Sequence, residues 1–174
     1  MGMESYSIMI VPKEVSLVCE EGYQKIIGRS EIDIVDVEEK LKSKVGQFVM
    51  NGRFIYDECL ELFLYQQEGK LQALELKGCL SWLKEGVKNS FQLISYLQDE
   101  YGELDTYVLN KKIEYEKESE LHQEICIAYN DKIAIFEKQY GNIELKATCG
   151  NFYKEVVKHT KWYYKILKGF KGKG

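Results

Sequence analysis

The sequence predicts an α+β protein made of two tandem units, each an antiparallel β-meander followed by a long helix, packed around a shared core. Two observations lead to this prediction. Short apolar runs separated by turn residues alternate with long segments of helical periodicity, and the second half of the chain resembles an earlier segment. A hydrophobic content of 45% in 174 residues is sufficient for such a core and excludes a disordered chain.

The resemblance between the two halves indicates an internal duplication. Residues 79–97 align with 149–167 without a gap. We therefore expect a first unit over 46–102 and a second unit over 103–174, while 1–45 adds a strand and a short helix to the first unit. All three parts are expected to form one compact globule. The paired units can share one continuous sheet or form two facing sheets, and the sequence leaves both arrangements open.

The N-terminal part contains one clear strand, one clear helix and an ambiguous segment between them. Residues 5–11 are β-branched and apolar, which predicts a strand. Residues 13–28 alternate in a way that favours a hairpin, although a helix is almost equally compatible. Residues 35–45 predict a short helix, because their apolar residues fall on one face and their charges on the other.

Two hairpins and a helix are predicted in the first unit. Asn51-Gly52 stands between two apolar runs and suits the positive φ angles of a type I′ turn. A second hairpin joins 60–65 to 71–76 around Glu68-Gly69. Residues 80–101 predict a long helix, because their apolar side chains recur every three or four positions as a continuous stripe.

The second unit is predicted to repeat this order with an acidic insertion. Residues 107–115 indicate two strands around Asn110-Lys111, and the insertion of about ten residues follows. Residues 125–137 predict a hairpin, because apolar residues alternate on both sides of a polar turn. A strand over 143–146 and a closing helix over 151–167 complete the unit.

Charge is distributed unevenly along the chain. The net charge is -4, but residues 154–174 carry +6, so the rest of the chain carries -10. Besides the acidic insertion, a second acidic group precedes and opens the helix predicted over 35–45. There it complements the helix dipole, and its members are Glu31, Asp33, Asp36, Glu38 and Glu39. An acidic body with a basic tail predicts electrostatic steering of charged partners.

Two sets of charged residues are candidate binding surfaces. The first is the acidic insertion, whose members share one face on a strand but spread around a helix: Glu114, Glu116, Glu118, Glu120 and Glu124. The second is a stripe of lysines at helical spacing, an alternative site for a polyanion: Lys154, Lys158, Lys161 and Lys165. Nucleic acid is the less favoured partner, because the acidic body repels it.

The sequence contains no motif of a catalytic centre, a cofactor site or a metal site. The five cysteines lack metal-ligand spacing, and both histidines, His122 and His159, are expected to be exposed. Cys79 and Cys149 stand at predicted helix starts, where a thiol is either reactive or buried at a corner, and burial is the preferred interpretation. We therefore expect no metal, no cofactor and, on balance, no enzymatic activity.

The same composition indicates a cytoplasmic location. No apolar run approaches the ~18 residues needed to cross a bilayer, and no secretory signal pattern opens the chain. Reduced thiols follow as the expectation for the cysteines. The abundance of Lys, Glu, Ile and Tyr suggests a bacterial coding sequence.

These observations favour a non-enzymatic protein-binding module, most concretely a small acidic inhibitor or immunity protein that neutralises a basic toxin or nuclease. The 13 tyrosines suit a protein interface. Two alternatives stay open. One is a nucleic-acid-binding or regulatory protein that uses the lysine-rich helix. The other is an enzyme with a site between the two units, formed by Cys149 or a pair of acids.

Overall fold

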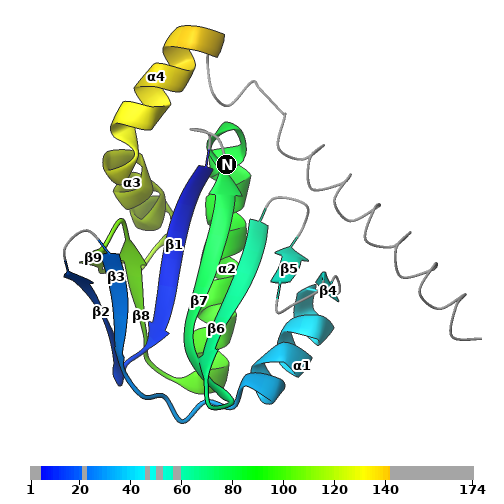
Figure 1. The fold of residues 1–174 in the computed structure, drawn as a ribbon. Coiled ribbons are helices and arrows are strands. Elements are labelled where there is room, and N and C mark those ends of the chain that lie inside the picture. The colour runs from blue at the N-terminus through cyan, green and yellow to red at the C-terminus, as the bar shows by residue number, and fades with distance from the viewer. Residues whose placement is uncertain (1–4, 21–22, 46–47, 50–52, 57–59, 142–174) are drawn as a thin grey trace, which may run out of the picture.

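A computed structural model describes residues 5–20, 23–45, 48–49, 53–56 and 60–141. Within these ranges the protein is α+β, as the sequence predicts. Seven strands form one antiparallel sheet in the order β4-β5-β6-β7-β1-β8-β9, with α2 behind it and the separate β2–β3 hairpin in front (Figure 1). The strands described from the two predicted units thus lie in one continuous sheet.

The bounds of these elements follow the apolar runs of the sequence. The main sheet contains β1 (Ser5–Pro12), β4 (Phe48–Val49), β5 (Arg53–Tyr56), β6 (Leu60–Gln67), β7 (Lys70–Cys79), β8 (Leu104–Val108) and β9 (Lys111–Ile113). The hairpin contains β2 (Val15–Glu20) and β3 (Tyr23–Gly28). The helices are α1 (Ile34–Val45), α2 (Leu83–Tyr101), α3 (Glu118–Ala128) and α4 (Asn130–Tyr140), and a 3₁₀ turn, η1 (Leu80–Trp82), leads into α2.

Strand β1 separates two hydrophobic clusters, one on each side of the sheet. Tyr6, Ile8 and Ile10 belong to the large cluster that includes the apolar side chains of α2. Met9 and Val11 belong to a smaller cluster with Val15, Ala73 and Tyr107, against which the β2–β3 hairpin packs. Successive side chains of a strand point to opposite faces, so a strand buried on both faces is almost continuously apolar.

The ambiguous segment over 13–28 is a hairpin. Strands β2 and β3 pair in antiparallel register, and Leu17 and Ile26 pack against the smaller cluster. The residues that follow them in sequence, Val18 and Ile27, point to the outer face and are exposed. The alternation of the sequence therefore reflects a strand with one buried face, and the helical alternative is wrong.

The hairpins predicted in the first unit are present. Glu68 and Gly69 connect β6 to β7 with φ angles of 52° and 78°, the left-handed conformation that a type I′ turn requires. Strands β4 and β5 also pair, with Phe48 opposite Phe54 and Val49 opposite Arg53. This register leaves three residues between Val49 and Arg53, whereas a two-residue turn at Asn51-Gly52 requires Val49 opposite Phe54, so the expected register is corrected by one residue. Residues 50–52 themselves lie outside the described residues.

The predicted hairpin over 125–137 is wrong, because this segment forms α3 and α4. Leu121, Ile125 and Tyr129 recur every four residues and are buried, and Phe136 continues the stripe. Ile127 and Ile135, which complete the strand-like alternation, are 61% and 47% exposed. Backbone bonds from Tyr129 N to Ile125 O and from Ile133 N to Tyr129 O carry the helical pattern across the junction.

The turn between β8 and β9 differs by one position from the prediction. Leu109 and Asn110 form it with φ angles of 46° and 68°, and Val108 pairs with Lys111. Asparagine tolerates the left-handed conformation, whereas leucine is exposed and strained there. The expected turn at Asn110-Lys111 is therefore corrected to Leu109-Asn110.

Several predicted features lie outside the described residues: the strand over 143–146, the helix over 151–167 and the second half of the internal duplication. The duplication and the domain boundaries at 45 and 102 therefore stay predictions. In the described part of the chain, no helix is long and apolar enough to cross a membrane.

Two glycines hold the buried ring of Tyr6 between the sheet and α2. A Cβ atom at Gly78 would lie 2.3 Å from Tyr6 Cζ, and a Cβ atom at Gly86 would lie 2.3 Å from Tyr6 Oη. Tyr6 is only 1% exposed, so its ring has no room to move aside. Glycine is therefore required at both positions by packing rather than by backbone conformation.

We expect Gly86→Ala to lower the free energy of unfolding by about 1–3 kcal/mol, because the added methyl group overpacks the core. Alanine at an unobstructed helix position would instead raise stability by about 1 kcal/mol. Chemical denaturation measures the effect in Gly86→Ala, in Tyr6→Phe and in the double variant Tyr6→Phe/Gly86→Ala.

Gly78→Ala is the matched control for this experiment. Removing the Tyr6 hydroxyl leaves the nearest ring carbon 3.4 Å from a Cβ atom at position 86, but still 2.3 Å from one at position 78. Tyr6→Phe should therefore relieve Gly86→Ala and not Gly78→Ala. Equal relief of both variants would contradict this packing account.

A tyrosine hydroxyl completes the hydrogen bonding of β1 beyond the end of β8. The register pairs Ile8 with Val108, so Ser7 would pair with Leu109, which belongs to the turn. The Ser7 N–H instead donates to Tyr129 Oη at 2.9 Å, and the same hydroxyl lies 3.4 Å from Ser7 O as a donor. The junction of α3 and α4 thereby replaces a strand partner.

Tyr129→Phe should lower the free energy of unfolding by about 1–3 kcal/mol, because it leaves a backbone donor of β1 without its partner. Amide hydrogen exchange checks the location of the effect. The exchange rate of the Ser7 amide should rise over its wild-type value by a larger factor than that of the Met9 amide. Met9 pairs with Tyr107 in β8, so its hydrogen bonding does not depend on Tyr129. Unchanged protection at Ser7 would show that the hydroxyl is dispensable.

Candidate functional site

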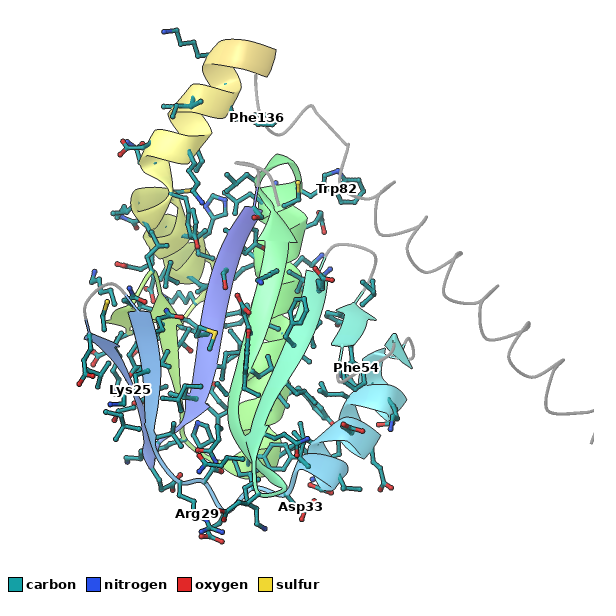
Figure 2. All side chains as sticks on the ribbon, viewed as in Figure 1. Lys25, Arg29, Asp33, Phe54, Trp82 and Phe136 are labelled. Atoms are coloured by element: carbon teal, nitrogen blue, oxygen red, sulfur yellow. The ribbon has the colours of Figure 1, made fainter. Side chains whose placement is uncertain are left out.

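A pocket of about 420 Å³ lies at the end of the sheet where β1 turns into β2 and α2 leads into β8. Pairing of Pro12 with Leu104 brings the two turns together. The loop before α1 is held at the same end, because Leu71 N donates to Ile32 O at 2.9 Å and Ile34 N donates to Gly69 O at 3.0 Å. Arg29 and Asp33, on either side of this loop, mark the same end in Figure 2.

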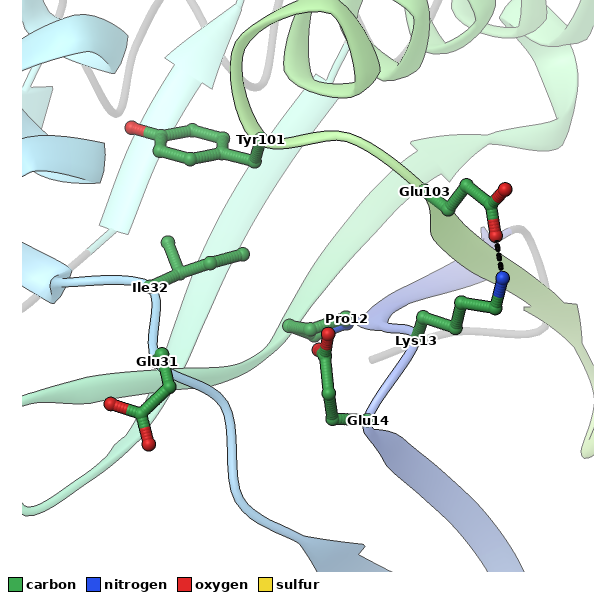
Figure 3. A pocket seen from close by; sticks show the side chains of 7 residues that line it. All are labelled: Pro12, Lys13, Glu14, Glu31, Ile32, Tyr101 and Glu103. Atoms are coloured by element: carbon green, nitrogen blue, oxygen red, sulfur yellow. Dashed lines mark hydrogen bonds and ion pairs between the residues drawn. The ribbon is translucent and has the colours of Figure 1, made fainter.

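The lining of this pocket combines apolar side chains with carboxylates. Its members are Pro12, Lys13, Glu14, Glu31, Ile32, Tyr101 and Glu103 (Figure 3). Lys13 forms an ion pair with Glu103, which leaves the carboxylates of Glu14 and Glu31 as excess negative charge. Both of these glutamates are exposed, so they stay accessible to a cation from solvent.

Tyr101 is fixed in the pocket wall by a network with α1. Its hydroxyl donates to Asp36 Oδ2 at 2.8 Å, and Lys40 Nζ lies 4.6 Å from the centre of its ring. The same ammonium lies 2.6 Å from Glu100 Oε2 and 3.2 Å from Asp36 Oδ2. Burial and the bond to Asp36 raise the pKa of Tyr101, so its hydroxyl is a neutral donor at physiological pH.

Ion pairs continue from the pocket along β8 and β9. Lys112 Nζ lies 2.7 Å from Asp105 Oδ2, and this bond raises the pKa of Lys112, with a smaller contribution from Glu114. Asp105 likewise contributes to the raised pKa of Lys13, whose main cause is the bond to Glu103. A chain of alternating charges therefore connects the pocket to the start of the acidic insertion.

Two of the five predicted acidic contact residues have roles within the fold. Glu120 accepts the backbone N–H groups of Glu116 and Lys117 at 2.8 and 3.3 Å, and the bond from Glu116 is the main cause of its lowered pKa. This arrangement satisfies donors at the start of α3. Glu124 Oε2 lies 3.2 Å from Lys111 Nζ and ties α3 to β9.

The other three, Glu114, Glu116 and Glu118, are exposed. They do not share a strand face, because β9 ends at Ile113 and α3 begins at Glu118. Their proposed contact with a partner stays a prediction. The alternative lysine stripe, together with Cys149 and His159, lies outside the described residues.

The second acidic group is partly explained by helix capping. Asp33 Oδ1 accepts the N–H of Val35 at 2.9 Å at the start of α1, as expected for a carboxylate at a helix N-terminus. Asp36 bonds Tyr101 instead, and Glu31 lines the pocket.

A polar cluster on the front face of the sheet surrounds Glu75. Its carboxylate accepts Ser7 Oγ at 2.7 Å and Tyr65 Oη at 2.6 Å, and Lys77 Nζ lies 3.3 Å away. Burial and the bond to Glu75 raise the pKa of Tyr65, which keeps its hydroxyl protonated. Two hydroxyl donors and one ammonium thus compensate the buried Glu75 side chain, and the cluster links β6, β7 and β1.

Two of the described cysteines, Cys79 and Cys126, and the described histidine, His122, lie in different surroundings. Cys79 is buried at the end of β7, as preferred from the sequence. His122 is half-buried rather than exposed, since it lies on α3 with its ring close to Cys126. Across the described ranges, no three side chains of His, Cys, Asp or Glu meet in a way that could hold a metal ion.

Sequence reasoning missed the pocket because its carboxylates come from distant segments. Glu14 and Glu103 are brought together only by the antiparallel register of β1 with β8. The acidic group before α1 was the one local signal, and it included Glu31. An expectation that β1 pairs with β8 would have added Glu14 and Glu103.

We expect Tyr101→Phe to raise the pKa of Asp36 toward its ordinary value, because the Tyr101 hydroxyl is the main cause that lowers it. A pKa that is lower in the folded than in the unfolded chain stabilises the protein above the unfolded-state pKa. This stabilisation is lost as the pH falls through the folded-state pKa. NMR titration of the Asp36 carboxyl group measures the shift.

Tyr96→Phe, on the same helix, is the matched control and should leave the pKa of Asp36 unchanged. Denaturation at several pH values gives a second readout. The difference in unfolding free energy between wild type and Tyr101→Phe should shrink from neutral to acidic pH. A constant difference would mean that the hydroxyl contributes by packing alone.

Comparison of the chain with protein-family models, with curated proteins and with solved structures gave no match in any of the three. The geometry of the pocket and the distribution of charge are therefore the basis for a functional proposal.

Proposed function

We propose that this protein is a non-enzymatic binding module of the bacterial cytoplasm that neutralises a basic protein, such as a toxin or a nuclease. The observation that carries the proposal is the acidic pocket at the end of the sheet. Its excess carboxylates, Glu14 and Glu31, line the pocket together with the apolar side chain of Ile32 and the ring of Tyr101.

This lining suits the side chain of an arginine or lysine from a partner. The alkyl stem of such a residue packs on apolar surface, while its cationic head binds carboxylates. Tyrosine and arginine are frequent anchors of protein interfaces, and a pocket that excludes water strengthens their contacts. Tyr101 is held in one orientation by Asp36, so the wall of the pocket is formed before a partner arrives.

Long-range electrostatics support the same partner. The chain outside residues 154–174 carries a charge of -10, which attracts a basic protein from beyond contact distance. The exposed insertion acids Glu114, Glu116 and Glu118 add to this field without a pocket of their own. We assign them to steering and assign Glu14 and Glu31 to direct contact.

Glu14→Gln/Glu31→Gln should weaken binding of the basic partner mainly through faster dissociation, by about tenfold or more, because contact charges act on the bound state. Glu116→Gln/Glu118→Gln, a matched removal of two charges, should slow association and reduce its salt dependence. The partner is first captured from native lysate on immobilised wild-type protein, and its binding kinetics are then measured with each variant at two salt concentrations.

The outcomes separate the parts of the proposal. Failure of the wild-type protein to retain a stoichiometric basic protein at low salt would contradict the function itself. Retention with equal dissociation rates for wild type and Glu14→Gln/Glu31→Gln would leave a binding function but place it outside the pocket. Retained nucleic acid in place of a protein would favour the lysine-rich segment.

A further inference from the structure

Lys13 places an ammonium group of the protein itself in the wall of the acidic pocket. Lys13 directly follows β1 and Glu103 directly precedes β8, and their side chains form an ion pair. Figure 3 shows this pair on one side of the pocket and Glu31 on the other. The pocket therefore already holds a cation of the kind that the proposed function assigns to a partner.

The ion pair between Lys13 and Glu103 is formed but easily broken. It is the main cause of the raised pKa of Lys13 and of the lowered pKa of Glu103. The two side chains are nevertheless 63% and 74% exposed. Water solvates both groups of such a pair almost as well as they solvate each other, so a pair of this kind shifts an equilibrium by at most about fivefold. A cation from outside can therefore compete for Glu103.

An arginine side chain gains most from such a competition. Glu14 and Glu31 are accessible to it without any change in the ion pair, whereas Glu103 becomes accessible only when Lys13 leaves. A guanidinium has five N–H donors in a planar fork and binds a carboxylate through two parallel bonds, whereas an ammonium acts as a single point charge. Replacement of the Lys13 ammonium by a guanidinium therefore strengthens the contact with Glu103.

We propose that Lys13 is an internal competitor in the acidic pocket, which an arginine side chain of the partner displaces from Glu103. In the free protein the Lys13 ammonium binds this carboxylate, and in the complex it moves into solvent while the guanidinium takes its place. Lys13 thereby lowers the affinity of the pocket for every cation that must displace it. This inference rests on the proposed function, because it describes how the same pocket admits its ligand.

The test is a titration of the full-length protein with N-acetyl-arginine amide, followed by NMR through the backbone amides of the pocket residues. Lys13→Gln should tighten binding of this probe by about three- to fivefold, because the probe no longer breaks an ion pair. Lys111→Gln is the matched control. It removes the same charge from an ion pair with Glu124, and neither residue lines the pocket. Because salt screens distant charges, the affinity should then change by less than about 1.5-fold.

Glu103→Gln separates displacement from a general effect of charge. In the wild type this substitution removes a contact with the probe, but it also removes the ion pair that the probe must break. In Lys13→Gln it removes the contact alone. Glu103→Gln should therefore weaken binding more in the Lys13→Gln background than in the wild type, by the roughly two- to fivefold that an exposed pair contributes.

Equal effects of Glu103→Gln in the two backgrounds would overturn the displacement, as would equal tightening by Lys13→Gln and Lys111→Gln. Absence of probe binding in both the wild type and Lys13→Gln would overturn it as well. Circular dichroism and the melting temperature show that each variant is folded, as expected for substitutions of exposed side chains. A wild-type protein that retains no basic protein from lysate, yet binds the arginine probe more tightly as Lys13→Gln, would contradict the proposed function and support the displacement.

Discussion

The packing of β1 between β7 and β8 is the constraint on which the rest of the structure depends. This strand joins the first four strands of the sheet order to the last two, and it contributes side chains to the hydrophobic clusters on both faces. Tyr6 is its tightest contact, because its ring occupies space that Gly78 and Gly86 leave free. The same strand carries Ser7, whose hydroxyl binds Glu75 and whose backbone binds Tyr129. Pocket, polar cluster and helical junction are therefore all positioned relative to one strand.

Elements with a strong local signal could be predicted from the sequence, and elements with two compatible periodicities could not. The β6–β7 hairpin has a turn that requires glycine, and α2 has an uninterrupted apolar stripe, so only one structure fits each. The segment of α3 and α4 contains Ile127 and Ile135, which mimic a strand although they face solvent. Leu121, one helical turn before Ile125, favours a helix over a strand in this segment, but it lies within a run of charged residues.

The candidate site shows a different limit of sequence reasoning. Acidic residues can be identified in any sequence, but the contacts that each carboxylate makes depend on residues that are distant along the chain. Glu120 and Glu124 satisfy donors of the fold, whereas Glu14 and Glu31 face a pocket. Local capping chemistry is sufficient to explain Glu120 and Asp33 after the helices are known. The pocket follows only from strand register, which depends on packing of the whole sheet.

The central position of the first strand has a consequence for the order in which the chain acquires its structure. Ser5 pairs with Cys79, and Ile8 pairs with Val108, so β1 gains its two neighbours only after about 80 and then about 110 residues have been made. At synthesis rates of about 5–20 residues per second, its apolar run waits on the order of several seconds for a partner strand. Contacts of such long sequence separation also slow folding. The strand that organises the native sheet is thus the one most exposed to wrong pairing while the protein is being synthesised.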